Sequence, residues 1–380
     1  MNILFVTNYF PKKNNTQEAI FLYWRAKELI KAGHKVTVLK WNQDVSDYFM
    51  KPYNLLDLND PILNIDIPVF PIHSIDLMIN PLHKKKRYQW IKSNFDIVHF
   101  HWLWSMTVFP DIKQWDIPFV ITCHGSDIYR MGESFNQWAI GRWLNKKVMQ
   151  MQMKRLNQAN HVIFVSTDIQ KSALKKGAKP KNQSVIHNGI NNIFNPIGRK
   201  TSVTVTVGYV GQLSALKRAD KLIEIFYKAS VMLHIDQFLI IGEGVLERAM
   251  KKEVEKYQLG EKVVFTGKIS APKVAEHMRA MNVLVLPSRQ EAFGCVIKEA
   301  QASGTPVVGS SNGGIPEVIG HGGRIVQEGE NFEERFATAI ADLIRKPMDE
   351  ADIIECAKPF NWYETVKKEI NVYENLCGGS

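Results

Sequence analysis

The sequence has few cysteines and no long hydrophobic run. Its four cysteines are scattered, and no two of them form a Cys-x-x-Cys pair. This pattern is unlike a disulfide framework or a zinc cluster and is typical of a reducing compartment. No apolar run approaches the roughly 18 residues of a membrane-spanning helix. The first ten residues lack the basic segment of a signal peptide and are predicted to form a strand.

Acidic residues are scarce in the first half of the chain. Residues 1–190 contain 25 Lys and Arg against 14 Asp and Glu, a net charge of +11. Residues 191–380 contain 23 against 24, a net charge of −1. Cations concentrated in one half indicate an anionic partner surface, which is either a membrane or a nucleic acid. The alternative is that these lysines only keep the protein soluble.

Short β-rich segments alternate with longer helical segments along the whole chain. A helix is expected from about Thr16 to Ala32, with Gly33 ending it. The predicted strands of the first half are ILFVT, KVTVL, DIVHF, PFVIT and HVIFV, and those of the second half are VTVGYVG, FLIIGEG, KVVFTG, VLVLPS, PVVGS and GRIVQ. The alternation predicts an α/β fold, with parallel sheets covered by helices on both faces.

The length of the chain, 380 residues, exceeds what one hydrophobic core usually holds, so two domains are expected. Residues 187–196, HNGINNIFNP, are rich in Asn, Gly and Pro and are interpreted as a linker. We expect doubly wound domains at 1–190 and 191–359, facing each other across a ligand-binding cleft. Residues 360–376 are predicted to form a helix that packs back on the first domain. Its apolar positions are Trp362, Val366, Ile370 and Tyr373.

The segment PSRQEAFGCVIKEAQASGTPVV, residues 287–308, places Glu291 in a loop and Glu299 in the helix that follows. Backbone N–H groups and the dipole at this helix start favour a diphosphate near Gly294, where the missing Cβ allows close approach. Carboxylates accept hydrogen bonds from vicinal hydroxyls, so the two acids suit the sugar and the ribose of a nucleotide sugar. On spacing alone, an ordinary loop residue and an ordinary helix residue explain them equally well.

This segment resembles the E-x7-E signature of the retaining glycosyltransferases of family 4, which have the GT-B fold. The resemblance continues through GTPVVGSSNGGIPEVI, GYVGQLSALKRADKLI, IIGEGVLERAM, VVFTGKI and TCHGSDIY. The opening FPKKNNTQEAIFLYWRAKELIKAGHKV is similar to that of members acting in cell-surface polysaccharide assembly, of the teichuronic-acid type. The likeness covers nearly the whole chain, and its motifs follow the family's order.

The resemblance implies roles for the residues that match. Glu291 is expected to contact the donor sugar, Lys217 to neutralise the departing diphosphate, and His124 to line the sugar from the first domain. These three are the expected catalytic residues, and Asp127 is expected to orient the loop of His124. The expected donor-binding residues are Gly211, Gln212, Lys217, Arg218, Gly125, Asp127, Glu299 for the ribose, and Phe293, Gly294, Cys295 and Val296 through their backbone N–H groups.

Two positions depart from the family pattern. Most relatives have arginine where this chain has Gln212, and glutamine cannot replace that charge on a diphosphate. Arg218, next to Lys217, is expected to compensate. Many relatives also have a Gly-Gly pair where this chain has Asn14, Asn15 and Thr16. We interpret Asn15 and Thr16 as acceptor-side residues.

Structural explanations compete with several of these roles. Lys217 can be an exposed lysine at a helix start, and a histidine after a strand, such as His124, is commonly a turn residue. His99 and His101 in HFHW suggest a metal pair, but packing on one strand face is favoured because no third ligand is evident.

No metal or other cofactor is expected. The chain has no Asp-x-Asp motif, which glycosyltransferases of the other main fold use to hold a divalent metal on the diphosphate. Lysine, the helix dipole and backbone amides would neutralise the diphosphate instead. The family retains anomeric configuration, and no residue is identified as a covalent nucleophile.

These expectations combine into one predicted function. A hexose or N-acetylhexosamine is transferred from a nucleotide sugar, with UDP as first choice, to a glycan or lipid-linked acceptor of the cell envelope. The acceptor is expected on the basic first domain, where KPYN, HKKKR and GRWLNKKVMQMQMKRL concentrate cations. The stripe Leu144, Val148 and Met151 is expected in the core, while its flanking cations face an anionic bilayer. The enzyme is expected in the cytoplasm, peripheral on the inner face of the cell membrane.

Three other functions are compatible with parts of the sequence. A nucleotide-sugar epimerase shares the fold but would lack the E-x7-E context. A non-catalytic nucleotide-sugar-binding or scaffold protein is suggested by Gln212 alone. Nucleic-acid binding rests on basicity only, without a recognition helix or an aromatic stacking platform. The sequence does not indicate an oligomeric state.

Overall fold

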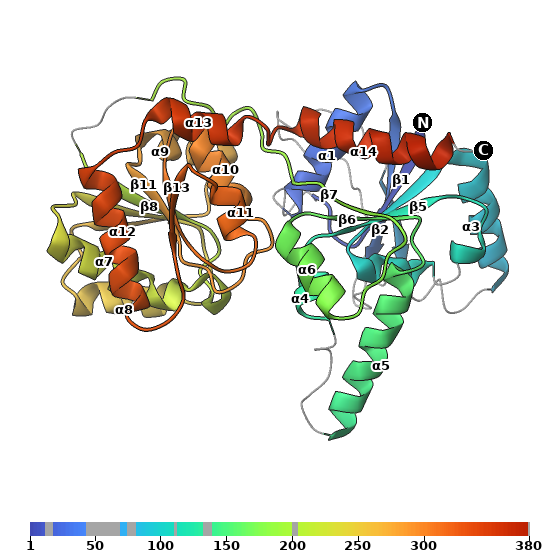
Figure 1. The fold of residues 1–380 in the computed structure, drawn as a ribbon, viewed down its shortest axis with the longest axis horizontal. Helices are drawn as coiled ribbons and strands as arrows, with labels where there is room; N and C mark the ends of the chain where they lie inside the picture. Colours follow the sequence, from blue (N-terminus) through green and yellow to red (C-terminus); the bar gives the residue numbers. More distant parts are fainter. Residues whose placement is uncertain are drawn as a thin grey trace. The chain divides into compact units, whose positions relative to one another are not determined.

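The computed structural model describes residues 1–11, 18–42, 69–73, 81–109, 112–131, 139–199 and 204–378. The chain divides into two compact units. Unit 1 is Met1–Gly189 with Trp362–Ser380, and unit 2 is Ile190–Asn361. Each unit has a parallel sheet with helices on both faces, which confirms the predicted α/β fold with two doubly wound halves (Figure 1).

Unit 1 contains a seven-stranded sheet in the order β3-β2-β1-β4-β5-β6-β7. The strands are β1 (Asn2–Thr7), β2 (Lys35–Asn42), β3 (Val69–His73), β4 (Ile97–His101), β5 (Phe119–Cys123), β6 (His161–Phe164) and β7 (Gln183–Val185). All five predicted strands are present. The sequence did not predict β3 and β7, the two outermost strands. Pro71 in β3 is tolerated because an edge strand pairs on one side only.

The helices of unit 1 are α1 (Ile20–Lys31), α3 (Pro81–Asn94), α4 (Ser126–Tyr129), α5 (Ala139–Leu156), α6 (Thr167–Lys175) and α14 (Trp362–Cys377), with 3-10 turns η2 (Leu103–Val108) and η3 (Ile112–Gln114). The predicted start of the first helix at Thr16 lies outside the described residues. The described helix begins after Ala19, whose φ of 49° is not helical. Gly33, at φ 88°, follows its end as predicted.

Helix α14 packs against α1 in unit 1, which confirms the prediction for the last segment (Figure 1). Val366 and Tyr373 are buried in the core cluster that includes residues of β1 and α1. Arg25 Nη1 of α1 lies 3.0 Å from Glu369 Oε1 of α14, and both side chains are fully buried. Removing only one partner of such a buried pair lowers the free energy of unfolding by several kcal/mol. The terminal helix is therefore part of the unit 1 core.

Helix α5 differs from the expectation. Met151 is 46% exposed, and Leu144 and Val148 are only partly buried. The buried face is instead formed by Asn145, Met153 and Leu156. The apolar stripe predicted for the core therefore lies at the margin of the buried face. The first turns of α5 extend away from the sheet (Figure 1).

Unit 2 contains a six-stranded sheet in the order β10-β9-β8-β11-β12-β13. The strands are β8 (Thr206–Val210), β9 (Gln237–Ile241), β10 (Val263–Gly267), β11 (Val283–Leu286), β12 (Val307–Ser310) and β13 (Gly323–Val326). The helices are α7 (Ala219–Met232), α8 (Glu247–Lys256), α9 (Ala271–Ala280), α10 (Cys295–Ala302), α11 (Ile315–Ile319), α12 (Phe332–Arg345) and α13 (Glu350–Ala357), with the 3-10 turn η4 (Ala215–Lys217). All six strands predicted for this half are present.

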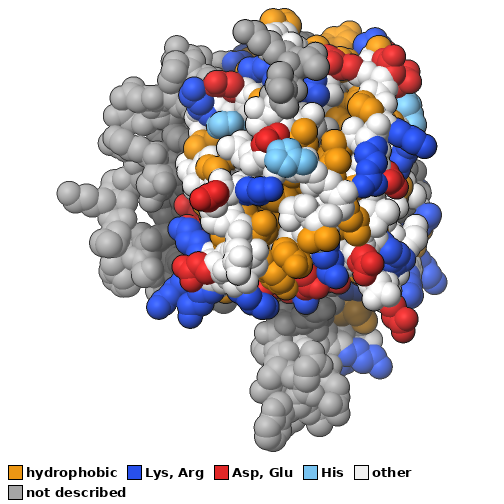
Figure 2. Space-filling view, turned by 90° about the vertical axis from the view of Figure 1, so that its left-hand side faces the viewer, with side chains coloured by type: hydrophobic (Ala, Val, Ile, Leu, Met, Phe, Trp, Pro, Cys, Tyr) orange, Lys and Arg blue, Asp and Glu red, His pale blue; other side chains and the backbone are white. Residues whose placement is uncertain are grey.

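The surface of unit 2 carries charges of both signs (Figure 2). The face of unit 2 in Figure 2 shows Lys and Arg interspersed with Asp and Glu. In α8, for example, Lys251 pairs with Glu247 and Lys256 with Glu253. Of the helices that the structure describes, none is both long enough and apolar enough to span a bilayer.

Candidate functional site

The carboxyl ends of β8 and β11 bring two predicted residues together in unit 2. These strands are neighbours, although their connections leave in opposite directions, so the sheet has its topological switch point here. Ligands of doubly wound sheets bind at such points. Lys217 follows β8, Glu291 follows β11, and Lys217 Nζ forms an ion pair with Glu291 Oε2. Both side chains are largely buried.

The loop of Glu291 is held by neighbours that the sequence did not identify. Gly314 N donates to the carbonyl of Glu291 at 2.9 Å. Gly313, at φ 59°, passes so close that a Cβ there would lie 2.1 Å from the same carbonyl. Arg289 forms two hydrogen bonds with Asp220 of α7, at 2.6 and 2.7 Å. Arg289 is therefore a positioning residue, and nothing in the spacing of the sequence indicates its partner.

Helix α10 begins directly after this loop. Gly294 precedes it with φ 82°, and a Cβ there would lie about 3 Å from side-chain carbons of Ile297 and Glu291. Phe293 is buried, so Phe293–Val296 form a fixed helix start beside Glu291. A helix N-terminus favours an anion through its N–H groups and dipole. This arrangement is suited to the diphosphate role predicted for these four residues.

Glu299 lies in the second turn of α10. The residue is half-buried. Desolvation by the surrounding protein raises the pKa of its carboxyl to about 7. A carboxylate in such a site gains most from hydrogen bonds that hydroxyl groups of a ligand donate to it. The ribose role stays a prediction that fits this environment.

The remaining unit 2 candidates lie in the loop after β8. Gly211 N donates to the Ile241 carbonyl at 3.0 Å, which joins this loop to the end of β9. Gln212 is exposed. Arg218, however, is buried, pairs with both carboxylate oxygens of Glu328 at 2.8 Å and covers the ring of Phe332. Only Nη2 of Arg218 is used in this pair, and its Nη1 is buried with no hydrogen-bond partner among the described residues, so compensation for the missing arginine at 212 stays a prediction.

In unit 1, His124 follows β5 within a group of aromatic rings. Its ring centroid lies 4.5 Å from that of Trp102 and 5.0 Å from that of Phe21. Its Nε2 lies 3.2 Å from Nδ1 of His101. Burial, with a smaller contribution from the charge of Arg25, holds the pKa of His124 well below its usual value. His124 is therefore neutral near pH 7 and can serve as a hydrogen-bonding group but not as a cation.

Asp127 holds the loop of His124. Its carboxylate accepts hydrogen bonds from the backbone N–H groups of Gly125 and Leu103, both at 2.9 Å. Burial raises the pKa of Asp127 to about 6, while these hydrogen bonds oppose the shift. This geometry agrees with the orienting role expected for Asp127.

The two histidines of HFHW are packed on one strand face. His99 Nδ1 lies 2.6 Å from the Tyr373 hydroxyl, and its Nε2 lies 2.7 Å from Thr122 Oγ1. Both ring nitrogens of His99 are thus used in the core. Over the described ranges, no group of three or more His, Cys, Asp or Glu side chains is placed to hold a metal.

The structure thus groups Lys217, Glu291 and the α10 start in unit 2, and His124, Gly125 and Asp127 in unit 1. Asn15 and Thr16 lie outside the described residues, as does KPYN.

Family models match both units. A model of glycosyl transferases group 1 matches residues 194–359, and a model of glycosyltransferase family 4 matches residues 21–192. The chain is a GT-B glycosyltransferase of the family 4 type.

Curated relatives support the assignment of this glycosyltransferase. An uncharacterized glycosyltransferase of Methanocaldococcus jannaschii is 26% identical, with 98% of each chain covered. The gpi3 subunit of the phosphatidylinositol N-acetylglucosaminyltransferase of Schizosaccharomyces pombe is 27% identical over 76% of this chain and 62% of its own. A D-inositol 3-phosphate glycosyltransferase of Mycobacterium marinum is 25% identical over 75% and 64%.

Solved structures share the fold of the glycosyltransferase at lower identity. Sucrose-phosphate synthase of Thermosynechococcus elongatus superposes with a TM-score of 0.75 at 20% identity, with 100% and 99% of the chains covered. HepE of Anabaena, solved with UDP, also gives 0.75, at 19% identity and 99% and 100% coverage.

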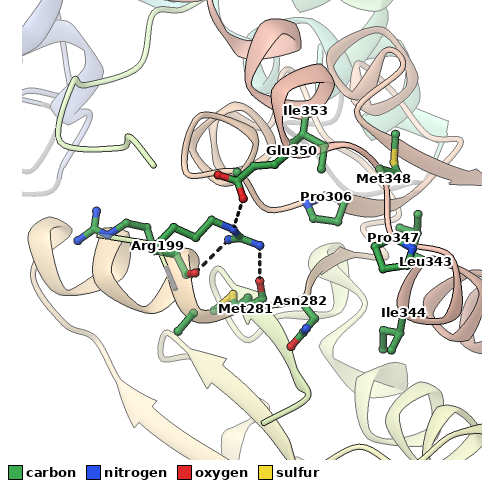
Figure 3. A pocket seen from close by; sticks show the side chains of 13 residues that line it. Arg199, Met281, Asn282, Pro306, Leu343, Ile344, Pro347, Met348, Glu350 and Ile353 are labelled. Atoms are coloured by element: carbon green, nitrogen blue, oxygen red, sulfur yellow. Dashed lines mark hydrogen bonds and ion pairs between the residues drawn. The ribbon is translucent and has the colours of Figure 1, made fainter. Parts of the chain in front are cut away.

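A pocket of about 260 Å³ lies elsewhere in the glycosyltransferase, at the amino ends of β11 and β12 (Figure 3). Arg199 on its wall donates to the carbonyl oxygens of Arg279 and Met281 and to Thr305 Oγ1, and pairs with Glu350. These contacts account for its charge and attach the segment after the linker to the unit 2 sheet. Doubly wound sheets bind ligands at the opposite ends of their strands, so we assign this pocket a structural role.

Proposed function

We propose that this glycosyltransferase transfers a hexose or N-acetylhexosamine from a UDP-sugar, with retention of configuration, to a glycan or lipid-linked acceptor. The observation that carries the proposal is the Lys217–Glu291 ion pair at the switch point, beside the start of α10. A cation, a carboxylate and a helix N-terminus meet where a nucleotide sugar offers a diphosphate and hydroxyl groups.

Related proteins support the choice of donor. HepE of Anabaena was solved with UDP, and also with UDP-glucose. The relative of Schizosaccharomyces pombe is named for the transfer of N-acetylglucosamine. These names favour a UDP-sugar that carries a hexose or an N-acetylhexosamine.

The roles follow from the charges. Binding of the donor exchanges partners: Lys217 turns from Glu291 to the diphosphate, and Glu291 turns to the sugar hydroxyls. Lys217 and the α10 dipole then stabilise the charge that develops on the leaving diphosphate, and such electrostatic stabilisation is typically the main source of rate enhancement. A lysine and a helix start supply this stabilisation without a divalent metal, so we propose that catalysis does not require one.

The basic composition of unit 1 supports a membrane partner. Helices α3 and α5 each contain five Lys and Arg and no acidic residue. Both adjoin the β4–β5 connection, α3 through the ring contact of Tyr88 with Trp115 and α5 against η2. On α5, Trp143 is 59% exposed and the ammonium of Lys147 lies 5.7 Å from its ring centroid. Exposed tryptophan beside lysine suits an anionic bilayer surface, which would place the enzyme on the inner face of the cell membrane.

A flotation assay tests this part separately. The protein is expected to float with vesicles containing phosphatidylglycerol and to stay in solution with phosphatidylcholine alone. Trp143→Ala combined with Lys147→Glu should reduce flotation, whereas Tyr363→Ala on α14 should not. Protein that remains in solution with both vesicle types excludes the membrane proposal.

A donor panel tests the catalytic proposal. Thermal stability and donor hydrolysis are measured with UDP-, GDP- and ADP-sugars for the wild type, Glu299→Ala and Lys217→Ala. Stabilisation by the UDP class alone, lost in both variants, is expected. Product NMR then gives the anomeric configuration, and activity should survive EDTA. If no donor stabilises the protein, Gln212 indicates a site that has lost turnover. The non-catalytic scaffold function is then favoured over transfer.

A further inference from the structure

A lysine is buried in the helix that begins at the proposed diphosphate site. Lys298 lies about one turn after the start of α10, and only 2% of its surface is exposed. Its ammonium donates to Gln301 Oε1 at 2.8 Å and to the carbonyl of Cys356 at 2.7 Å, and lies 4.3 Å from the ring centroid of Phe360. Each of these contacting groups is neutral. Among the described residues, no carboxylate forms an ion pair with Lys298.

The cations in the loops after β8 and β11 differ from Lys298, because each has a carboxylate partner. The pairs are Lys217 with Glu291, Arg218 with Glu328, and Arg289 with Asp220. Their charges are therefore largely balanced before a ligand binds. The charge of Lys298 is balanced by no such partner, so it adds directly to the positive potential around α10.

The charged form of Lys298 is stabilised by the end of α13. The carbonyl of Cys356 belongs to the last turn of that helix, where the dipole is negative and carbonyl oxygens lack partners within the helix. Phe360 adds a cation–π contact. Burial opposes this stabilisation and lowers the pKa of Lys298 to about 8, so the ammonium predominates at pH 7. A neutral amide could donate similar hydrogen bonds without burying a charge, so capping of α13 does not by itself explain a lysine.

The ammonium lies close to the start of α10. The ring of Phe360 is near both groups, because its centroid lies 6.0 Å from that of Phe293 and 4.3 Å from Lys298 Nζ. The ammonium is therefore within about 10 Å of the Phe293 ring, which is buried. At an effective dielectric constant of about 20, a unit charge roughly 10 Å from another changes an equilibrium about tenfold.

We infer that Lys298 is a second cation for the donor diphosphate, which strengthens diphosphate binding at the α10 start through its charge and without direct contact. The inference rests on the proposed function, because it assumes that a diphosphate binds there. It deepens that function by assigning a role to the buried side of α10. Since Lys298 does not touch the ligand, its effect should depend on the charge of the ligand and not on its shape.

Calorimetry with three probes tests the inference: UDP, inorganic pyrophosphate and uridine. Lys298→Met keeps a long apolar side chain and removes the charge. It should weaken the binding of UDP and pyrophosphate about tenfold and leave uridine unchanged, whereas a structural defect would weaken uridine as well. Lys251→Met is the matched control. Lys251 also covers a phenylalanine ring, that of Phe265, but it is exposed and pairs with Glu247, so the control should bind all three probes as the wild type does.

A pH titration of the wild type gives a second test that needs no variant. The ammonium of Lys298 is lost as the pH rises through about 8. The ratio of UDP affinity to uridine affinity should therefore fall about threefold from about pH 7 to about pH 8.5. Glu299, expected at the ribose, acts on both ligands and cancels in this ratio. The Cys356 thiol also acts on Lys298, so Cys356→Ser is measured beside the wild type and should show the same fall.

The outcomes separate the inference from the proposed function. Equal binding of UDP and pyrophosphate by the wild type and Lys298→Met overturns the role of Lys298, as does an equal loss for uridine. The donor proposal stands in either case if the wild type binds UDP. If the wild type binds pyrophosphate but not UDP, and Lys298→Met weakens that binding, the role of Lys298 stands and the proposed UDP donor fails. Binding of neither ligand overturns both. If Lys298→Met does not fold, the pH titration decides, and a constant affinity ratio overturns the inference.

Discussion

The two units share a strand order and differ in what they place at the switch point. In unit 2 the neighbouring central strands lead to Lys217 and Glu291, which form an ion pair. In unit 1 they lead to Tyr9 and Trp102, whose rings meet edge to face. The same topology brings the loops after two central strands together in both units, with charged side chains in unit 2 and aromatic rings in unit 1. The fold thus supplies the position, and the loop residues supply the chemistry.

The units also differ in how they bury charge. Unit 1 pairs Arg25 with Glu369, and Arg25 Nη2 also donates to Asn188 Oδ1 at 2.9 Å. Unit 2 buries Lys298 against neutral acceptors, Gln301 Oε1 and the Cys356 carbonyl, with the Phe360 ring 4.3 Å away. Desolvation there lowers the pKa of Lys298 to about 8. Paired charge ties α14 into unit 1, whereas Lys298 ties α10 to α13 and to the segment that follows it.

The largest expected effect is on the stability of unit 1. Arg25→Met leaves the Glu369 carboxylate buried without its cation, and we expect a loss of about 3–5 kcal/mol in the free energy of unfolding. Hydrogen exchange should show the loss in β1 and α14 but not in the unit 2 sheet. Adding Glu369→Leu should recover much of it. An equal loss in both units would mean that they unfold as one.

The next effect concerns catalysis in unit 2. Lys217→Ala should reduce turnover about 10²–10³-fold, because it removes a preorganised cation from the leaving group. The fold should be unaffected. Lys221→Ala is the control, since the Lys221 side chain is 44% exposed and pairs with Glu224 of its own helix, α7. Equal turnover by the two variants would show that Lys217 has no catalytic role.

A smaller effect separates binding from turnover. Glu291→Gln releases Lys217 from its ion pair, so UDP should bind about fivefold more tightly, equivalent to roughly 1 kcal/mol. Donor turnover should fall because the sugar contact is lost. Calorimetry measures the affinity for UDP, and a donor-hydrolysis assay measures the turnover. Weaker binding of UDP by Glu291→Gln would contradict the proposed exchange of partners.

A companion variant tests the role of Arg218. Glu328→Gln removes the carboxylate that holds Arg218. If UDP then binds more tightly, Arg218 can replace the arginine missing at position 212. If UDP affinity is unchanged, Arg218 is a structural residue, and Lys217 with the α10 start binds the diphosphate without it.

The smallest effect is a pH dependence due to Glu299. Its folded pKa of about 7 lies above the usual carboxyl value, so the folded state retains a proton that the unfolded state has lost. Stability should therefore fall as pH rises from about 4.5 to about 7. UDP affinity should rise over the upper part of that window, because the ionised carboxylate is the better acceptor for ribose hydroxyls. Glu299→Gln should flatten both profiles, and an unchanged profile would show that another group titrates.

Local sequence determined most of the secondary structure. Every predicted strand is present, and α14 lies where the spacing of Trp362, Val366 and Tyr373 indicated. Apolar runs, helical periodicity and Gly or Pro breaks act over a few residues, so they can be read without the fold. The exceptions were β3, which contains Pro71 at a sheet edge, and β7, which is only three residues long.

Only the tertiary structure decided which groups meet. One partner of His99 is Tyr373, 274 residues away, and Arg218 is held by Glu328, 110 residues away. The buried face of α5 was also misjudged, because Asn145 rather than Met151 faces the unit 1 core. Sequence indicated that Lys217 and Glu291 matter, but their pairing arises from the neighbouring positions of β8 and β11. Strand order brings distant loops together, and no local pattern in the sequence encodes that order.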